Sequence, residues 1–154
     1  MEAARAATID DLPAMVDLAR ALRAELRAMR GGALWELRDA RPEPFDDAFR
    51  SLLASEDACL VVGTIDEAVI GYAAVELETL RDGTRLGVIT ELFVDPEARG
   101  VGVGEAIAER LVAFCTEARC VGIDANALPG HRDTKNFFER TGFTARSLTM
   151  HKRL

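Results

Sequence analysis

The stretch VDPEARGVGVG, residues 94–104, is the most informative part of this 154-residue chain. Three alternating glycines follow an arginine and stand at the start of a segment that predicts a helix over residues 104–118. Glycine lets a backbone approach a ligand because no Cβ stands in the way. The free amides at a helix start, with the positive end of the helix dipole, favour an anion. The stretch therefore predicts a site for a phosphate or pyrophosphate, with Arg99 as an added cation.

Two other kinds of phosphate-binding loop fit this stretch less well. A Walker A loop requires Gly-Lys-Ser/Thr, whereas Glu105 follows Gly104 here. A dinucleotide-binding loop requires G-x-G-x-x-G close against its strand. The glycines here run G-x-G-x-G, and residues 95–99 separate them from the strand. Asp124 nevertheless stands where a ribose-binding acid could lie, so a nucleotide-binding module remains an alternative.

The sequence on both sides of this loop predicts a mixed α/β domain. Thr8 with Asp11 three residues on is typical of a helix start, and residues 45–53 have helical periodicity. Residues 33–44 are typical of a loop. Further helices are expected at 104–118 and 134–141, and strands at 59–65, 69–79, 86–94, 121–127 and about 144–153, after an initial strand.

The element order is therefore β-α-α-β-β-β-α-β-α-β. Three consecutive strands with short turns indicate an antiparallel meander. We expect a single domain over residues 1–154, with a largely antiparallel sheet flanked by about four helices.

Composition and charge disfavour several classes of protein. Lys and Arg number 19 against 26 Asp and Glu, which gives a formal net charge of −7. The longest apolar run, residues 68–75, is far shorter than the ~20 residues of a membrane helix. An acidic chain without a basic cluster is also a poor candidate for binding nucleic acid. We therefore expect a cytoplasmic protein with no membrane or nucleic-acid partner.

The cysteines and histidines indicate no metal centre. Cys59, Cys115 and Cys120 form no C-x-x-C pair, and His131 and His151 are the two histidines. An odd number of cysteines without paired spacing favours neither a disulfide framework nor a zinc site. We expect no metal.

The motif Arg99-x-x-Gly102-x-Gly104 resembles the R/Q-x-x-G-x-G/A motif of the GNAT superfamily of N-acetyltransferases. The resemblance continues through ITELFVDPEARGVGVGEAIAERL (89–111) and through NFFERTGF (136–143), which is similar to the family's FYE-x-x-GF helix. The closing MHKRL and the element order are also similar. The resemblance implies the GNAT fold, acetyl-CoA as co-substrate, and direct transfer of the acetyl group to a primary amine on a small molecule or peptide. Dimers are common in the family, so a homodimer is an implied assembly.

The resemblance also implies which residues bind coenzyme A. The strand end, Phe93 and Val94, would pair with pantetheine like an added strand, and an amide there would polarise the thioester carbonyl. Asn126 and His131 stand near the position of a frequent family asparagine and would contact the coenzyme, with His131 also able to act as an acid. The pyrophosphate would be held by the backbone amides of Arg99, Gly100, Val101, Gly102, Val103 and Gly104.

Charge distribution fits this arrangement. Residues 131–154 hold six Lys and Arg against two Asp and Glu, whereas the first 130 residues hold 13 against 24. The basic end would help to bind an anionic coenzyme, and the acidic remainder would suit a cationic amine.

A general base is needed because an amine at neutral pH is mostly protonated. Glu91 is the best candidate, since many relatives carry an acid at this place, and strict alternation would put it on one face with Ile89 and Phe93. Glu76 and Glu78, on the preceding strand, would add negative charge. Trp35 lies in the segment that family members use to shape the acceptor pocket.

One position departs from the family pattern. The FYE tyrosine protonates the leaving thiolate in many members, but Phe138 stands there and has no proton to donate. Tyr72, the single tyrosine, does not align with it. Either water or another group assists the thiolate, or the protein is a non-catalytic acyl-CoA-binding or regulatory module of the same fold.

Overall fold

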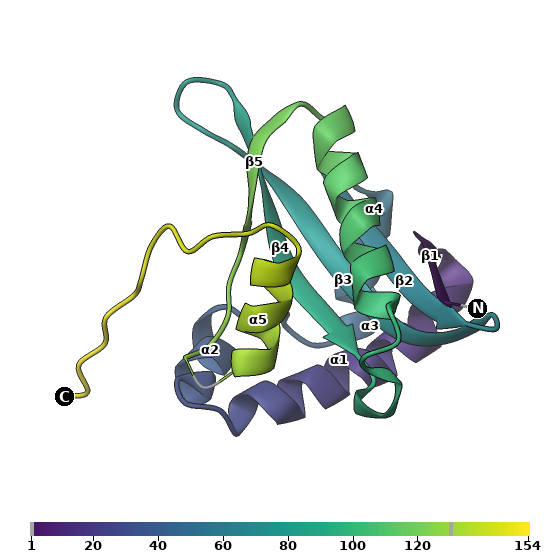
Figure 1. Cartoon of the computed structure of the whole chain (residues 1–154), viewed down its shortest axis with the longest axis horizontal. Coiled ribbons are helices and arrows are strands. Elements are labelled where there is room, and N and C mark those ends of the chain that lie inside the picture. The colour runs from purple at the N-terminus through teal and green to yellow at the C-terminus, as the bar shows by residue number, and fades with distance from the viewer. Residues whose placement is uncertain (1, 130) are drawn as a thin grey trace.

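The computed structural model describes residues 2–129 and 131–154. In this part of the chain, a five-stranded sheet with the order β1-β2-β3-β4-β5 forms the middle of the molecule (Figure 1). The strands are β1 (Glu2–Ala6), β2 (Ala58–Ile65), β3 (Ala68–Thr79), β4 (Arg85–Val94) and β5 (Cys120–Ala125). The helices are α1 (Leu12–Arg27), α2 (Gly32–Arg38), α3 (Phe45–Ala54), α4 (Val103–Glu117) and α5 (Arg132–Arg140), with 3-10 turns at Ile9–Asp11 and Pro96–Ala98.

Helices cover both faces of the sheet. On one face, α1 and α3 bury Met15 and Phe49 against Tyr72, and we name this cluster the α1-side core. On the other face, α4 and α5 bury Ile107 and Phe138, and this cluster is the α4-side core. A side chain on β4 therefore faces one core or the other according to its position along the strand.

The antiparallel meander expected from the sequence is confirmed. β2 pairs with β3 and β3 with β4, both antiparallel, and each of these strands starts one residue earlier than expected. β1 pairs antiparallel with β2, while β5 runs parallel to β4, which it reaches through the crossover helix α4. The expected class, a mixed α/β domain with a largely antiparallel sheet, is correct.

Residues 33–44 were expected to be a loop, but they contain most of α2. Gly31 ends the preceding turn with a left-handed φ of +83°, and Gly32 starts α2. A Cβ at Gly32 would lie 1.8 Å from the carbonyl oxygen of Leu26, so this close approach needs glycine. With α2, the described part of the chain has five α-helices, one more than expected.

The final strand expected at about residues 144–153 is wrong. The described residues after α5 form neither helix nor strand, and Figure 1 shows this tail leaving the domain. Residues 144–154 are exposed, with Leu148 and Met150 at 85% and 87%, so they bury none of the apolar surface that would hold a strand in a sheet. Arg146 pairs with Asp124 of β5.

Asp11 connects β1 to the start of α1. Its carboxylate accepts hydrogen bonds from the Arg5 guanidinium at 2.8 and 2.9 Å and from the backbone N–H of Thr8 at 2.8 Å. The Arg5 hydrogen bond is the main reason why the pKa of Asp11 lies below its ordinary value. The Thr8–Asp11 spacing therefore marks a helix start, as the sequence indicates.

Replacing Asp11 by Asn should lower the free energy of unfolding by about 1–2 kcal/mol at neutral pH, because a half-exposed ion pair and a helix-start hydrogen bond are weakened. A carboxylate with a lowered pKa stabilises the fold above the ordinary pKa and loses that effect as pH falls through the lowered one. The difference between wild type and variant should therefore shrink in acid. Urea unfolding at neutral and at acidic pH measures the free energy of unfolding of wild type and variant. Asp10→Asn, at an exposed position, is the control. Equal losses of stability in the two variants would contradict the role given to Asp11.

Candidate active site

A one-residue bulge in β4 decides which way the candidate base faces. Ala74 on β3 pairs with Glu91 and the next residue, Val75, pairs with Ile89, so Thr90 has no residue opposite it. Ile89 lies in the α4-side core. The expected shared face of Ile89 and Glu91 is therefore wrong, since the extra residue turns Glu91 to the other side of the sheet.

Glu91 is buried beside an arginine that is distant in sequence. The residue is 7% exposed, and its Oε1 accepts a hydrogen bond from Arg41 Nε at 2.8 Å. Arg41 Nη2 donates to Thr90 Oγ1 at 3.0 Å and to Glu76 Oε2 at 3.1 Å. Arg41 belongs to residues 39–44, between α2 and α3, so this segment covers the Glu91 side of the sheet.

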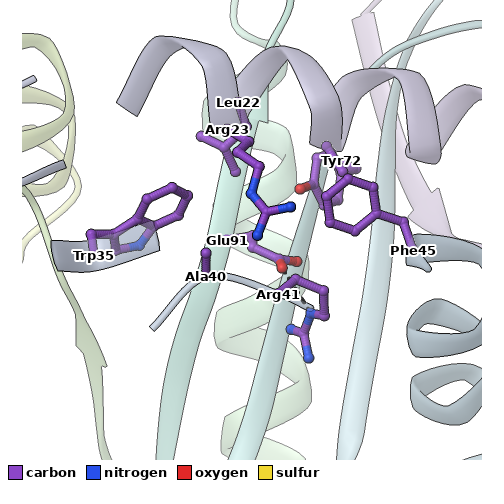
Figure 2. Close-up of a pocket in the computed structure, with 9 residues that line it drawn as sticks. Leu22, Arg23, Trp35, Ala40, Arg41, Phe45, Tyr72 and Glu91 are labelled. Carbon is purple, nitrogen blue, oxygen red and sulfur yellow. Dashed lines mark hydrogen bonds and ion pairs between the residues drawn. The ribbon is translucent and has the colours of Figure 1, made fainter. Parts of the chain in front are cut away.

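A small pocket surrounds Glu91 (Figure 2). Figure 2 shows the guanidinium groups of Arg23, from α1, and Arg41 on either side of the Glu91 carboxylate. The cavity measures about 10 Å³, which is room for about one water molecule. Its walls are Ala19, Leu22, Arg23, Trp35, Ala40, Arg41, Phe45, Tyr72 and Glu91.

The polar groups of this pocket are incompletely paired. Glu91 Oε2, the Tyr72 hydroxyl and Arg23 Nε are buried and have no hydrogen-bond partner in the described structure. Burial raises the pKa of Glu91, while the Arg41 guanidinium acts in the opposite direction. Burial also raises the pKa of Tyr72 well above its ordinary value, so its hydroxyl keeps its proton. Glu91 thus has an oxygen available for a donor and a raised affinity for a proton.

The glycine loop presents free amides at the start of α4. Gly100 and Gly102 have left-handed φ angles of +85° and +94°, and a Cβ at either would meet nothing within 4 Å. Within the described structure, the backbone N–H groups of residues 100–105 donate to no protein oxygen. A row of free amides at a helix N-terminus is chemically suited to an anion.

Arg99 lies beside this loop but its guanidinium points back to the strand. Its Nε donates to the carbonyl oxygen of Val94 at 2.9 Å, and its Nη2 donates to Glu25 on α1 at 3.0 Å. The guanidinium also stands over the Phe93 ring, 5.3 Å from the centroid. Glu25 offsets the charge of Arg99, so the groups of the loop that are free to contact an anion are its backbone amides.

The second half of β4 has an open edge. Pairing with β5 ends where Ile89 meets Ala125, so among the described residues no strand pairs with residues 90–94 on that side. Phe93 and Val94 bury their side chains in opposite cores while their backbone follows this open edge. The edge leads directly to the glycine loop.

His131 precedes α5 and connects it to α1. One ring nitrogen lies 3.3 Å from Glu25 Oε2, and the other is 2.7 Å from the Thr134 hydroxyl. Asn126 is exposed directly after β5. Phe138 is 7% exposed in the α4-side core, with its ring against those of its neighbours Phe137 (5.4 Å) and Phe143 (5.1 Å).

Sequence reasoning missed Arg41, Arg23 and Glu25, and it gave Tyr72 no role. Arg41 is separated from Glu91 by 50 positions and belongs to a segment without periodicity. An arginine in such a segment carries no signal that identifies its partner. Trp35, which the family resemblance places in the segment that shapes the acceptor pocket, lines the small pocket beside Glu91.

The described residues form neither a metal-binding cluster nor a membrane-spanning helix. No group of three or more His, Cys, Asp or Glu side chains is placed to hold a metal ion. None of the helices found there has the length and apolarity to cross a membrane.

Comparison with known proteins identifies the family. Glucosamine 6-phosphate N-acetyltransferase 1 of Oryza sativa subsp. japonica is 29% identical over 137 residues, covering 82% of this chain and 81% of that protein. The crystal structure of glucosamine-6-phosphate N-acetyltransferase from Arabidopsis thaliana has a TM-score of 0.73 at 21% identity, covering 99% of this chain and 98% of that one. A tetramutant protein from Bacillus halodurans has a TM-score of 0.82 at 21% identity, covering 98% and 99%. These two structural similarities concern the fold.

The model of the acetyltransferase (GNAT) family matches residues 21–143, which include the glycine loop, β4 and α5. The resemblance seen in the sequence motifs is therefore confirmed. This chain belongs to the GNAT family of acetyltransferases.

Proposed function

We propose that this acetyltransferase transfers the acetyl group of acetyl-CoA directly to a primary amine, with Glu91 as the general base. One arrangement carries the proposal. The open edge of β4 runs from the buried Glu91 to a loop of free amides, so one extended ligand could reach both.

The described residues fit coenzyme A. The backbone of Phe93 and Val94 would pair with pantetheine, and the amides of residues 99–104 would hold the pyrophosphate with the help of the α4 dipole. Asn126 directly follows β5 and His131 directly precedes α5. Both would border the coenzyme bound along the open edge of β4. Acetyl-CoA supplies an activated thioester, and a backbone amide of β4 would polarise its carbonyl.

Glu91 would take the proton that the acceptor ammonium must lose before it attacks. Its unpartnered Oε2 and its raised pKa support this role. In the protein without ligand, Arg41 pairs with the other carboxylate oxygen, Oε1. Trp35 would form the wall of the acceptor pocket.

The leaving thiolate needs a proton from a group other than Phe138. His131 is the residue directly before α5, and it is held between Glu25 and Thr134. Its position is about two helical turns before Phe138, which favours the same side of α5 for both residues. His131 or water would therefore protonate the thiolate.

Phe138 also favours a second candidate function, a non-catalytic acyl-CoA-binding or regulatory module. Thiol release from acetyl-CoA across a panel of amines separates the two. The panel should include glucosamine 6-phosphate, the acceptor named in the relatives, and simple alkylamines. Amine-dependent thiol release supports the enzyme, whereas coenzyme A binding without any release would support the module.

Replacing Gly102 by Glu should lower the affinity for acetyl-CoA at least about 100-fold, equivalent to ~2.7 kcal/mol, because a carboxylate would enter the proposed pyrophosphate site. Isothermal titration calorimetry measures this. Gly83→Glu is a matched control, since Gly83 has a similar φ of +86° and equally open surroundings but lies between β3 and β4. Similar affinities in the two variants would contradict the loop assignment.

Replacing Glu91 by Gln should lower kcat by about 10²–10⁴-fold while the affinity for acetyl-CoA is unchanged, because the amide cannot take a proton. The rate of the wild-type enzyme should fall in acid as Glu91 becomes protonated, and its raised pKa moves this fall to higher pH than for an ordinary glutamate. The variant should lose this acidic limb. Steady-state kinetics against pH tests this, with exposed Glu117→Gln as control; an unchanged limb would reject Glu91 as the base.

A further inference from the structure

Arg41 occupies a ready-made site for a cation. The acceptors of its hydrogen bonds are two carboxylates, Glu91 and Glu76, and the hydroxyl of Thr90, at 2.8, 3.1 and 3.0 Å. All three belong to β3 or β4, the rigid part of the site. Arg41 itself comes from residues 39–44, which are irregular, and its side chain is 14% exposed.

This site has accepting capacity that Arg41 does not use. The Glu91 side chain is 5% exposed, yet its Oε2 has no hydrogen-bond partner. The Tyr72 hydroxyl is buried on the same pocket wall and is also unpartnered. Buried polar atoms without partners are costly, so an N–H donor that entered the pocket would be stabilised by them.

The local charges favour a cation over an anion once Arg41 is displaced. Arg23, the other arginine of the pocket, has two carboxylates of its own, Glu36 and Glu43, each 3.9 Å away. Glu91 and Glu76 would then lack a cation. An anionic group would be repelled by these two unpaired carboxylates. An ammonium group would instead pair with them in place of the guanidinium.

The space at the site leads to the same conclusion. The cavity beside Glu91 measures about 10 Å³, whereas ligand pockets are usually about 300–1,000 Å³. An acceptor can therefore reach Glu91 only when a side chain moves. Arg41 is the charged wall residue that comes from an irregular segment, whereas Trp35 and Leu22 belong to helices and would stay to cover an alkyl chain.

We propose that Arg41 is an internal competitor of the acceptor, and that the acceptor is an alkylammonium compound whose cationic group displaces the Arg41 guanidinium from Glu91, Glu76 and Thr90. This inference rests on the proposed function, because it places the ammonium next to the general base. When the acceptor enters, it removes Arg41 from Glu91, so binding of the acceptor also frees the base. While Arg41 is bound, Glu91 is paired; when the ammonium takes its place, Glu91 faces the proton that it must remove.

Binding of a guanidinium probe tests the site without any acetyl transfer. Arg41→Ala should have a lower Tm than wild type, and methylguanidinium chloride at saturating concentration should raise it by about 3 °C or more relative to sodium chloride at equal ionic strength. Wild type and Arg38→Ala, whose arginine is 70% exposed and paired with Asp39, should show no such rise. A folded Arg41→Ala protein without the rise would overturn the proposal.

Kinetics test the competition. Arg41→Ala should lower KM for an alkylamine about tenfold, because the acceptor no longer has to displace an internal group, while KM for acetyl-CoA stays unchanged. Glucosamine 6-phosphate should gain less than the alkylamine. A raised KM for the amine, or a preference for the anionic acceptor that is lost in the variant, would show that Arg41 binds substrate and would overturn the proposal.

If Arg41→Ala does not fold, Arg41→Lys decides. Its single ammonium cannot make the forked contacts to Glu91, Thr90 and Glu76, so an acceptor should displace it more easily and KM should still fall. An unchanged or raised KM would overturn the proposal. A different result would contradict the proposed function and not the binding site: methylguanidinium binds as expected, but no amine causes thiol release from acetyl-CoA.

Discussion

The bulge at Thr90 is the constraint on which the candidate site depends. Without the extra residue, Glu91 and Ile89 would face the same core, and a carboxylate would be buried among the side chains of α4. With it, the strand keeps Ile89 in the α4-side core and turns Glu91 toward α1 and residues 39–44. Arg41 then offsets the free-energy cost of burying Glu91 by pairing with its carboxylate. Arg41 also donates to the hydroxyl of Thr90, the extra residue of the bulge.

Three parts of the chain converge at the end of β4. Arg99 bonds to Val94 and Glu25, and Glu25 in turn lies next to His131. The glycine loop, α1 and the start of α5 are therefore connected by side chains at the place where the open edge of β4 ends. The candidate base lies on the strand and the free amides lie on the loop, so this junction determines the distance between the two halves of the candidate site.

The sequence predicted the parts of the fold that depend on local patterns. The meander has alternating apolar residues and short turns, and the loop before α4 has glycines where the backbone needs a left-handed φ, at Gly100 and Gly102. The prediction of a final strand over residues 144–153 was wrong, because these residues bury no apolar surface. The prediction of a loop over residues 33–44 was wrong, because Gly31 and Gly32 end one element and also start the next, α2.

The candidate site was less predictable, for a physical reason. Sequence motifs indicated the glycine loop and Glu91 as candidates, since backbone geometry and position along a strand can be inferred from local sequence. The partner of Glu91 is Arg41, which lies on a segment whose position depends on how α2 and α3 pack. The sheet face to which Glu91 points depends on the bulge at Thr90. A single extra residue in a strand reverses the faces that alternation predicts for the residues beyond it.

Gly104 has a further consequence for the contact between α4 and α5. A Cβ there would lie 3.0 Å from the Phe137 ring, so the start of α4 and the middle of α5 touch with no space between them. The glycine motif and the NFFERTGF motif are therefore two sides of one packing contact, although 33 positions separate these two residues. A Cβ at position 104 therefore requires the Phe137 ring to move by a few tenths of an ångström, and a longer side chain requires a larger movement. The size of the side chain at 104 and the position of the Phe137 ring are thus coupled.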